Sequence, residues 1–125
     1  MRTAALIQKP VHGPTAMPAK TVFEAATLGG AEAMGLLAET GSLEPGKKAD
    51  LAMINLRRLH CTPFEGSNIY AQLVYQAKGS DVTLTMVDGK IVFENGELKT
   101  IDEEEVIAKA NKLIRRVYER AGLIS

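Results

Sequence analysis

The chain has 125 residues, with 15 basic and 15 acidic side chains and therefore no formal net charge at pH 7. This length fits one domain at most, since an eight-stranded barrel with eight helices needs roughly twice as many residues. A neutral balance gives no steering towards nucleic acid, an anionic membrane or an acidic substrate. One cysteine excludes an internal disulfide, and the lack of a long apolar run or a leader pattern predicts a cytoplasmic protein.

The first forty residues predict short helices joined by a loop rich in proline and glycine. We expect the first helix to end before Pro10, because proline cannot donate the next helical hydrogen bond. The pair Gly29–Gly30 predicts a break after the second helix, and Gly35 is a left-handed cap for the third. The expected ranges are 2–9, 19–27 and 30–34.

The middle of the chain predicts a turn, a strand and a further helix. Pro45 and Gly46 suit the two central positions of a type II turn, since the first needs the fixed φ of proline and the second a positive φ. Residues 49–56 are mostly apolar, as expected for a strand covered on both faces. Residues 68–77 place apolar side chains at helical spacing.

Three further strands are predicted between residues 82 and 99. Asp88–Gly89 and Asn95–Gly96 are two-residue sequences that favour type I′ turns, and both lie between apolar runs. The resulting meander has strands at 82–87, 91–94 and 97–99.

The last segment has the strongest helix signals in the chain. Asp102 and Glu105 form a capping-box pattern, and three acidic residues occupy the first turn while basic residues follow towards the other end. The stripe predicted to be buried on this helix consists of Val106, Ala110, Leu113 and Val117.

A resemblance to a known family extends over nearly the whole chain. It is carried by GSLEPGKKADL, by GPTAMPAKTVFEAATLGGAEAMGL before it and by NIYAQLVYQAKGSDVTLTMVDGKIVFENGEL after it. These segments resemble the C-terminal part of metal-dependent amidohydrolases, in the branch of cytosine deaminase, atrazine chlorohydrolase and the S-adenosylhomocysteine and 5'-methylthioadenosine deaminases. The resemblance implies an α+β fold: outer helices of a TIM-type barrel (1–40), strands of a composite β-sandwich with an inserted helix (41–100), and a C-terminal helix (101–125).

The resemblance also implies which chemistry this chain lacks. Family members use zinc or iron to activate water for deamination or dechlorination of a nitrogen heterocycle. Their ligands are a His-x-His pair, further histidines and an aspartate that would precede Met1, and none has a counterpart here. Such hydrolysis needs at least three converging ligands. We therefore expect no catalytic, cofactor-binding or metal-binding residues in this chain, and no activity from it alone.

The remaining chemical groups have structural interpretations. His60 and Cys61 are adjacent, but no second pair completes a metal site, so we expect His60 to cap or pack at a strand end and Cys61 to be a small buried side chain. His12 lies in the first loop, where contact with a substrate is the alternative to no role. The acidic cluster at 102–105 could bind a cation, but a helix cap is the expected role.

The expected partner of the chain can be inferred from the surfaces that other parts of a complete family member would cover. The faces with Leu6, Phe23 and Leu28 should rest on barrel strands, and the predicted strands should pair with strands from the N-terminal end of the enzyme. Without these partners we expect a homodimer or higher oligomer. The alternatives are a stand-alone module that associates with itself or with another sheet, and an active enzyme formed with a separately encoded N-terminal chain.

Overall fold

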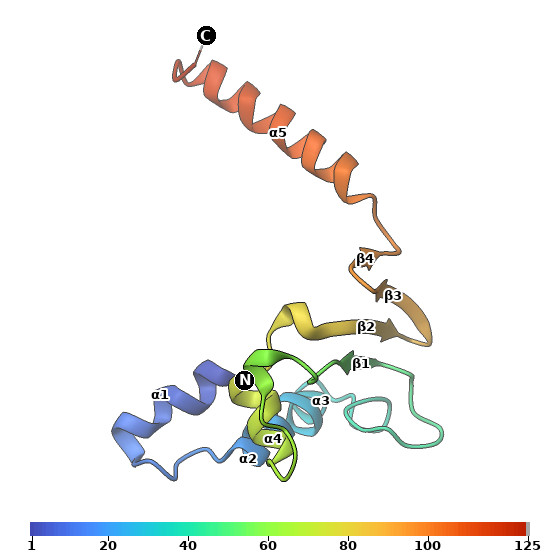
Figure 1. The fold of residues 1–125 in the computed structure, drawn as a ribbon. Coiled ribbons are helices and arrows are strands. Elements are labelled where there is room, and N and C mark those ends of the chain that lie inside the picture. Colours follow the sequence, from blue (N-terminus) through green and yellow to red (C-terminus); the bar gives the residue numbers. More distant parts are fainter. Residues whose placement is uncertain (125) are drawn as a thin grey trace.

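The computed structural model describes residues 1–124 and has an α+β architecture. A cluster of helices lies beside a four-stranded antiparallel sheet, and the last helix extends away from both, as Figure 1 shows. In the described residues, no helix is long and apolar enough to cross a membrane.

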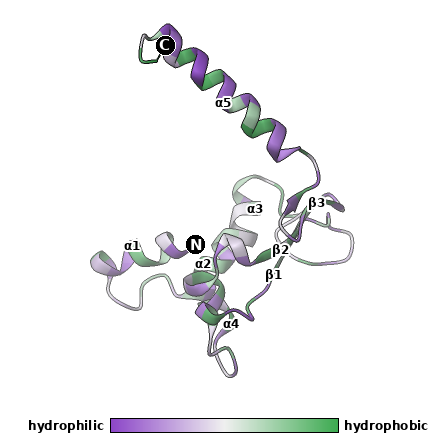
Figure 2. Cartoon of the chain, turned by 45° about the horizontal axis from the view of Figure 1, so that its top comes forward, coloured by the Kyte–Doolittle hydropathy of each residue, from purple (hydrophilic) through white to green (hydrophobic). Residues whose placement is uncertain are grey.

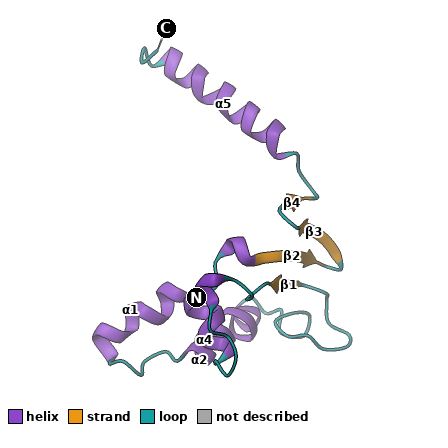
Figure 3. Cartoon of the chain, viewed as in Figure 1, coloured by secondary structure: helices purple, strands orange, loops and turns teal. Residues whose placement is uncertain are grey.

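The helical cluster is built from four short helices and has a small core. Figure 3 shows them grouped at one end of the molecule: α1 (Arg2–His12), α2 (Ala19–Glu24), α3 (Gly30–Ala33) and α4 (Ile69–Ala71). The buried side chains at its centre are Ala5, Val22 and Val74. Beside them, the rings of Phe23 and Tyr70 lie with centroids 5.4 Å apart. Phe23 is only partly buried, so the prediction that its face rests on barrel strands stays a prediction.

Helix α1 continues through Pro10, so the predicted end of the helix before this residue is wrong. Proline removes one helical N–H, and the carbonyl group that it leaves without a partner belongs to the exposed residue Leu6, where water can bind it. The Lys9 side chain donates to the carbonyl oxygens of Pro14 (2.7 Å) and Ala16 (3.1 Å), which ties the following loop to the helix.

The predicted break at Gly29–Gly30 is also wrong. A π-helical segment η1 (Ala25–Gly29) joins α2 to α3, and both glycines have helical backbone angles. Each glycine costs only roughly 1 kcal/mol in a helix, and the helix continues to the buried Ala31 of α3. The helix ends as predicted at Gly35, whose φ is +72°.

The helix predicted over 68–77 is confirmed. It consists of α4 followed by the π-helical segment η3 (Gln72–Gln76). The Asn68 side chain caps its start by accepting hydrogen bonds from the backbone N–H groups of Tyr70 (2.9 Å) and Ala71 (3.4 Å).

The sheet has the strand order β1-β2-β3-β4, and each neighbouring pair is antiparallel. Its strands are β1 (Leu51–Ile54), β2 (Val82–Val87), β3 (Lys90–Glu94) and β4 (Glu97–Leu98). Both predicted hairpin turns are confirmed, because Asp88 and Gly89 (φ +49° and +75°) and Asn95 and Gly96 (+49° and +93°) all have positive φ. The turn at Pro45 is likewise followed by a positive φ at Gly46, of +91°.

One expectation about the sheet is wrong. Residues 49–56 were expected to be covered on both faces, whereas β1 is shorter than this range, and Ala52 and Met53 are exposed. The strand pairs with β2 of the same chain, so its neighbour on that side is internal. Within residues 1–124 this apolar strand therefore remains partly uncovered.

The last helix, α5 (Glu103–Arg120), is capped as predicted: the Asp102 side chain accepts a hydrogen bond from the Glu105 N–H (3.0 Å). The Glu105 carboxylate pairs with Lys109 (2.6 Å), so only one half of the capping box is present in the described residues. The predicted burial of its apolar stripe is wrong, because α5 has no buried residue. Figure 2 shows the reason, since α5 stands clear of the other elements.

Candidate functional site

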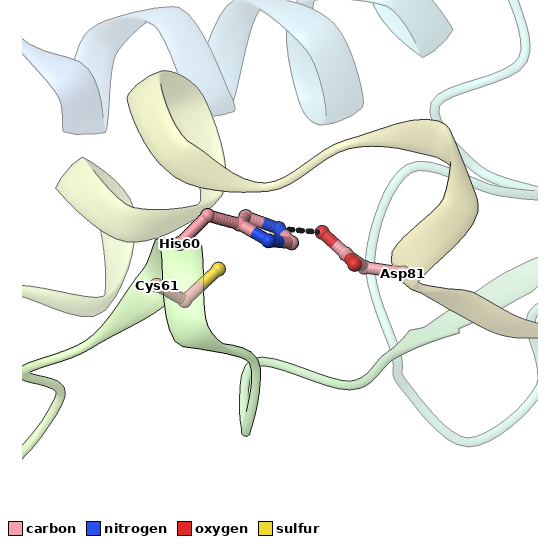
Figure 4. A group of neighbouring side chains, drawn as sticks. All are labelled: His60, Cys61 and Asp81. Carbon is pink, nitrogen blue, oxygen red and sulfur yellow. Dashed lines mark hydrogen bonds and ion pairs between the residues drawn. The ribbon is translucent and has the colours of Figure 1, made fainter.

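The strongest cluster of chemically active side chains lies where the helical cluster meets the sheet. A short 3-10 turn, η2 (Leu59–Cys61), presents His60, and a second one, η4 (Gly79–Asp81), places Asp81 directly before β2. As Figure 4 shows, the two side chains point towards each other, and His60 Nε2 lies 2.7 Å from Asp81 Oδ2. The pair joins residues 21 positions apart in the chain.

Asp81 is almost fully buried, with 2% of its surface exposed, and its carboxylate is well supplied with donors. The backbone N–H of Lys78 donates to it (2.8 Å), and the Nε of Arg58 lies 3.9 Å away. The bond from Lys78 and then that from His60 lower the pKa of Asp81 below its ordinary value. Asp81 is therefore an ionised anchor, and its own carbonyl oxygen accepts the Asn55 N–H (2.8 Å) beside β1.

Cys61 and Gln72 complete the packing on the helical side. Cys61 is fully buried, which agrees with its predicted role as a small core side chain. The buried Gln72 amide donates to the carbonyl oxygens of Cys61 (3.2 Å) and Pro63 (3.3 Å). These bonds fix the backbone of η2 and so orient His60 towards Asp81.

His60, Cys61 and Asp81 could be considered as metal ligands, because each offers a ligand atom and these atoms lie within 4.8 Å of one another. The geometry does not fit zinc. Two ligands at about 2.0–2.1 Å from a tetrahedral ion are roughly 3.3 Å apart. The nitrogen of His60 and the oxygen of Asp81 are closer than this, at 2.7 Å, and form a hydrogen bond. Binding would also compete with the Lys78 N–H for the same carboxylate oxygen.

The other predicted candidates do not join this cluster. His12 is the last residue of α1 and is exposed. The acidic residues after Asp102 occupy the first turn of α5, and Asp102 caps the helix, which is the role expected from the sequence. The structure thus brings together only His60 and Cys61 from the sequence candidates, and it adds Asp81, Arg58 and Gln72.

Sequence patterns gave no direct signal for Asp81 or Gln72. Asp81 follows Gly79 and Ser80, so it reads as a loop residue, and Gln72 has ordinary helix propensity. A weak signal was present, because an acidic residue immediately before an apolar strand needs a partner if it is buried. His60 was a candidate partner without an assigned contact, but its pairing with Asp81 across 21 positions depends on the fold.

The chain is similar to several deaminases. It is 47% identical over 116 residues to a 5-methylthioadenosine/S-adenosylhomocysteine deaminase of Moorella thermoacetica, covering 92% of this chain and 27% of that protein. It is 43% identical over 123 residues to a 5'-deoxyadenosine deaminase of Methanosarcina acetivorans, covering 98% of this chain and 28% of the relative. The chain therefore spans little more than a quarter of the length of these relatives.

Solved structures give the same result. An adenosine deaminase of Xanthomonas campestris with bound zinc is 37% identical, with a TM-score of 0.87, over 94% of this chain and 27% of that structure. The atrazine chlorohydrolase TrzN of Arthrobacter aurescens complexed with zinc is 27% identical, with a TM-score of 0.77, over 90% and 25%. The profile of the amidohydrolase family matches residues 1–92. The chain belongs to the amidohydrolase family.

Proposed function

We propose that this chain forms the C-terminal structural part of a metal-dependent amidohydrolase and is inactive alone. Residues 1–40 would supply outer helices of the barrel, residues 41–100 strands of the composite sandwich, and residues 101–125 the final helix. The supporting observation is that nearly the whole chain aligns with about a quarter of each deaminase. The complete enzyme would deaminate an adenine nucleoside, the class of compound named in these relatives.

The physical chemistry of the chain supports the same proposal. Among the described residues, the buried apolar side chains larger than alanine or cysteine are Val22 and Val74. Many large apolar side chains remain exposed, among them Leu6 (45%) and Leu28 (40%) on the helices that would contact barrel strands. So many exposed large apolar side chains beside so small a core are what a segment covered by another polypeptide would have.

In this proposal the His60–Asp81 pair is a structural link. It holds η2 against the start of β2, so it fixes the sheet relative to the helical cluster. In a complete enzyme this would set the angle between the sandwich and the barrel wall. The pair would contribute no step of the hydrolysis, which zinc-activated water would perform at ligands outside this chain.

A chimera tests the proposal. The matching quarter of the Moorella deaminase is replaced by this chain, and release of ammonia from 5'-methylthioadenosine is measured next to the parent enzyme and to this chain alone. We expect activity from the chimera and none from the chain alone with added zinc. A chimera with Val22→Asp is the matched control, since loss of the helical core should abolish its activity.

Two results would contradict the proposal. Deamination by the chain alone would show that it carries its own site. A folded, zinc-loaded chimera without activity would favour the second candidate, a stand-alone module that associates with itself or with another sheet. The exposed apolar face of α5 is the observation that favours this candidate.

A further inference from the structure

Helix α5 has an apolar face that nothing in the described chain covers. About half of the surface of Val106, Leu113 and Val117 is exposed (49%, 59% and 47%), and Figure 2 shows apolar and polar stripes alternating along the helix. The helix lies beyond residues 1–92, the part matched by the family profile, although the alignment with the Methanosarcina acetivorans deaminase covers 98% of the chain. At 1.5 Å per residue its 18 residues span about 27 Å, long enough for a seam of several turns.

The stripe is symmetric from end to end. Starting at Glu103, it continues at steps of 3, 4, 3, 4 and 3 residues through Val106, Ala110, Leu113 and Val117 to Arg120. These steps keep all six side chains on one side of a helix. From its N-terminal to its C-terminal end, the stripe has one acidic, four apolar and one basic side chain. The small Ala110 near the middle allows a second helix to approach closely.

We propose that α5 pairs with α5 of a second copy of this chain, with the two helices antiparallel. In this arrangement Val106 of each copy faces Val117 of the other, and Ala110 faces Leu113. The same register places Glu103 beside Arg120 at both ends. The pairing is isologous, so a two-fold axis closes it as a dimer.

Charge selects the antiparallel direction. The first turn of α5 contains only acidic charges and its last turn ends in Arg120, so a parallel pair would place like charges together at both ends. In the described residues neither Glu103 nor Arg120 forms an ion pair, since those within α5 are Glu105–Lys109 (2.6 Å) and Arg115–Glu119 (3.2 Å). Arg120 donates from Nε to the Arg116 carbonyl oxygen at 3.4 Å, a long bond that the contact with Glu103 would replace.

The surface shape agrees with this register. An open hollow on α5 is lined by Leu113, Val117 and Arg120, together with Arg116 and Glu119. It lies level with Val106 of the second copy in the antiparallel pair, so this side chain would fill it as a knob fills a hole. The contact is short for a protein interface, and we therefore expect reversible, concentration-dependent dimers.

Charge reversal tests the pairing in the full chain. Sedimentation equilibrium is measured from low micromolar to several hundred micromolar for the wild type, Glu103→Arg, Arg120→Glu and the double variant. We expect each single variant to weaken dimerisation about tenfold, because like charges meet at both ends. The double variant should recover, and an equimolar mixture of the two single variants should form heterodimers of near wild-type affinity. Weakening by each single reversal together with recovery in the double variant requires antiparallel helices, because a parallel homodimer places like charges together at both ends in the wild type and in all three variants.

Matched controls separate pairing from helix stability. Glu104→Arg makes the same charge change as Glu103→Arg, and Lys112→Glu makes the same charge change as Arg120→Glu. Neither Glu104 nor Lys112 lies on the stripe. Both should dimerise as the wild type does, and circular dichroism should show equal helix content for all variants. A monomer at every concentration overturns the pairing. This result is expected if another part of an enzyme covers α5. A dimer that ignores the reversals at Glu103 and Arg120 also overturns the pairing.

Discussion

The short helix α2 and the long helix α5 differ in what stabilises them. Helix α2 has six residues and no side-chain cap, yet its Val22 is buried in one cluster with Ala5 of α1 and Val74 of η3. Helix α5 has 18 residues, a capping aspartate and an acidic first turn, but buries none of its side chains. The comparison shows that strong local signals specify a helix without specifying where it packs, while packing sustains a helix whose local signals are weak.

The largest expected effect separates the two helices directly. Val22→Asp buries an unpaired carboxylate in the helical core and should destabilise it by about 3–5 kcal/mol. Val117→Asp makes the same change on exposed α5 and should change the stability of the core by less than about 0.5 kcal/mol. Urea unfolding followed by circular dichroism at low micromolar concentration measures both. Equal losses would mean that α5 packs on the core.

Two glycines sharpen the distinction between packing and local conformation. Gly41 and Gly46 have nearly the same positive φ, +92° and +91°. A Cβ on Gly41 would lie 2.8 Å from the Cβ of Ala31, whereas nothing is within 4 Å of one on Gly46. Gly46→Ala should cost about 1–2 kcal/mol from backbone strain alone. Gly41→Ala should cost roughly 1–3 kcal/mol more. Equal unfolding midpoints for the two variants would show that the loop around Gly41 moves away from α3.

The Asp81 anchor predicts a dependence of stability on pH. Its folded-state pKa lies below the ordinary value of 3.8, so the unfolded chain takes up this proton more readily. The stabilisation is therefore present at neutral pH and is lost as the pH falls below 3.8, through the folded-state pKa. Asp81→Asn should lower the melting midpoint at pH 7 by several degrees and should flatten this acid limb. Glu65→Gln, which removes an exposed charge, should leave the acid limb as it is in the wild type.

Removal of one cap in each region gives a smaller effect. Asn68 caps α4 and Asp102 caps α5 in the same way, by accepting backbone N–H bonds. Either change to alanine should destabilise its own helix by about 1 kcal/mol. Asn68→Ala should lower the cooperative melting midpoint, since α4 leads directly into η3, which holds the buried Gln72 and Val74. Asp102→Ala should reduce only the helical signal of α5. A lower midpoint for both variants would show that the two regions unfold together.

Zinc should have no effect on either region. After incubation with one equivalent of zinc and dialysis against a weak chelator, we expect less than a tenth of an equivalent to remain, about the level of non-specific carry-over for a chain without a complete ligand set. Cys61→Ser is the control, because it removes the one thiolate of the cluster. Retention near one ion per chain that this variant abolishes would identify His60, Cys61 and Asp81 as a metal site.

Local features of the structure could be predicted from the sequence. The turn at Asp88–Gly89, the cap at Asp102 and the helix end at Gly35 each depend on one or two residues whose conformational preference is strong. The family resemblance correctly implied an α+β chain, whereas the barrel and the composite sandwich stay predictions. Each of these properties is encoded within a few neighbouring residues.

Features that depend on distant contacts could not be predicted in this way. Proline and glycine mark breaks, yet the helices continue through Pro10 and through Gly29–Gly30, where the cost to the helix is small enough to be tolerated. The candidate site shows the same limit: His60 was noticed, but its partner Asp81 lies in another turn. The stripe on α5 was identified correctly as apolar, but an apolar stripe does not reveal whether its cover belongs to the same chain.

The isolation of α5 also determines how its amide protons exchange with solvent. Amides near Val22 become accessible mainly when the whole helical cluster opens, so their exchange reports the global free energy of unfolding. Amides of α5 need only a local opening of the helix, since no packed side chain holds it. In deuterium oxide the last helix should therefore lose its protons first, although it is the longest element of the chain.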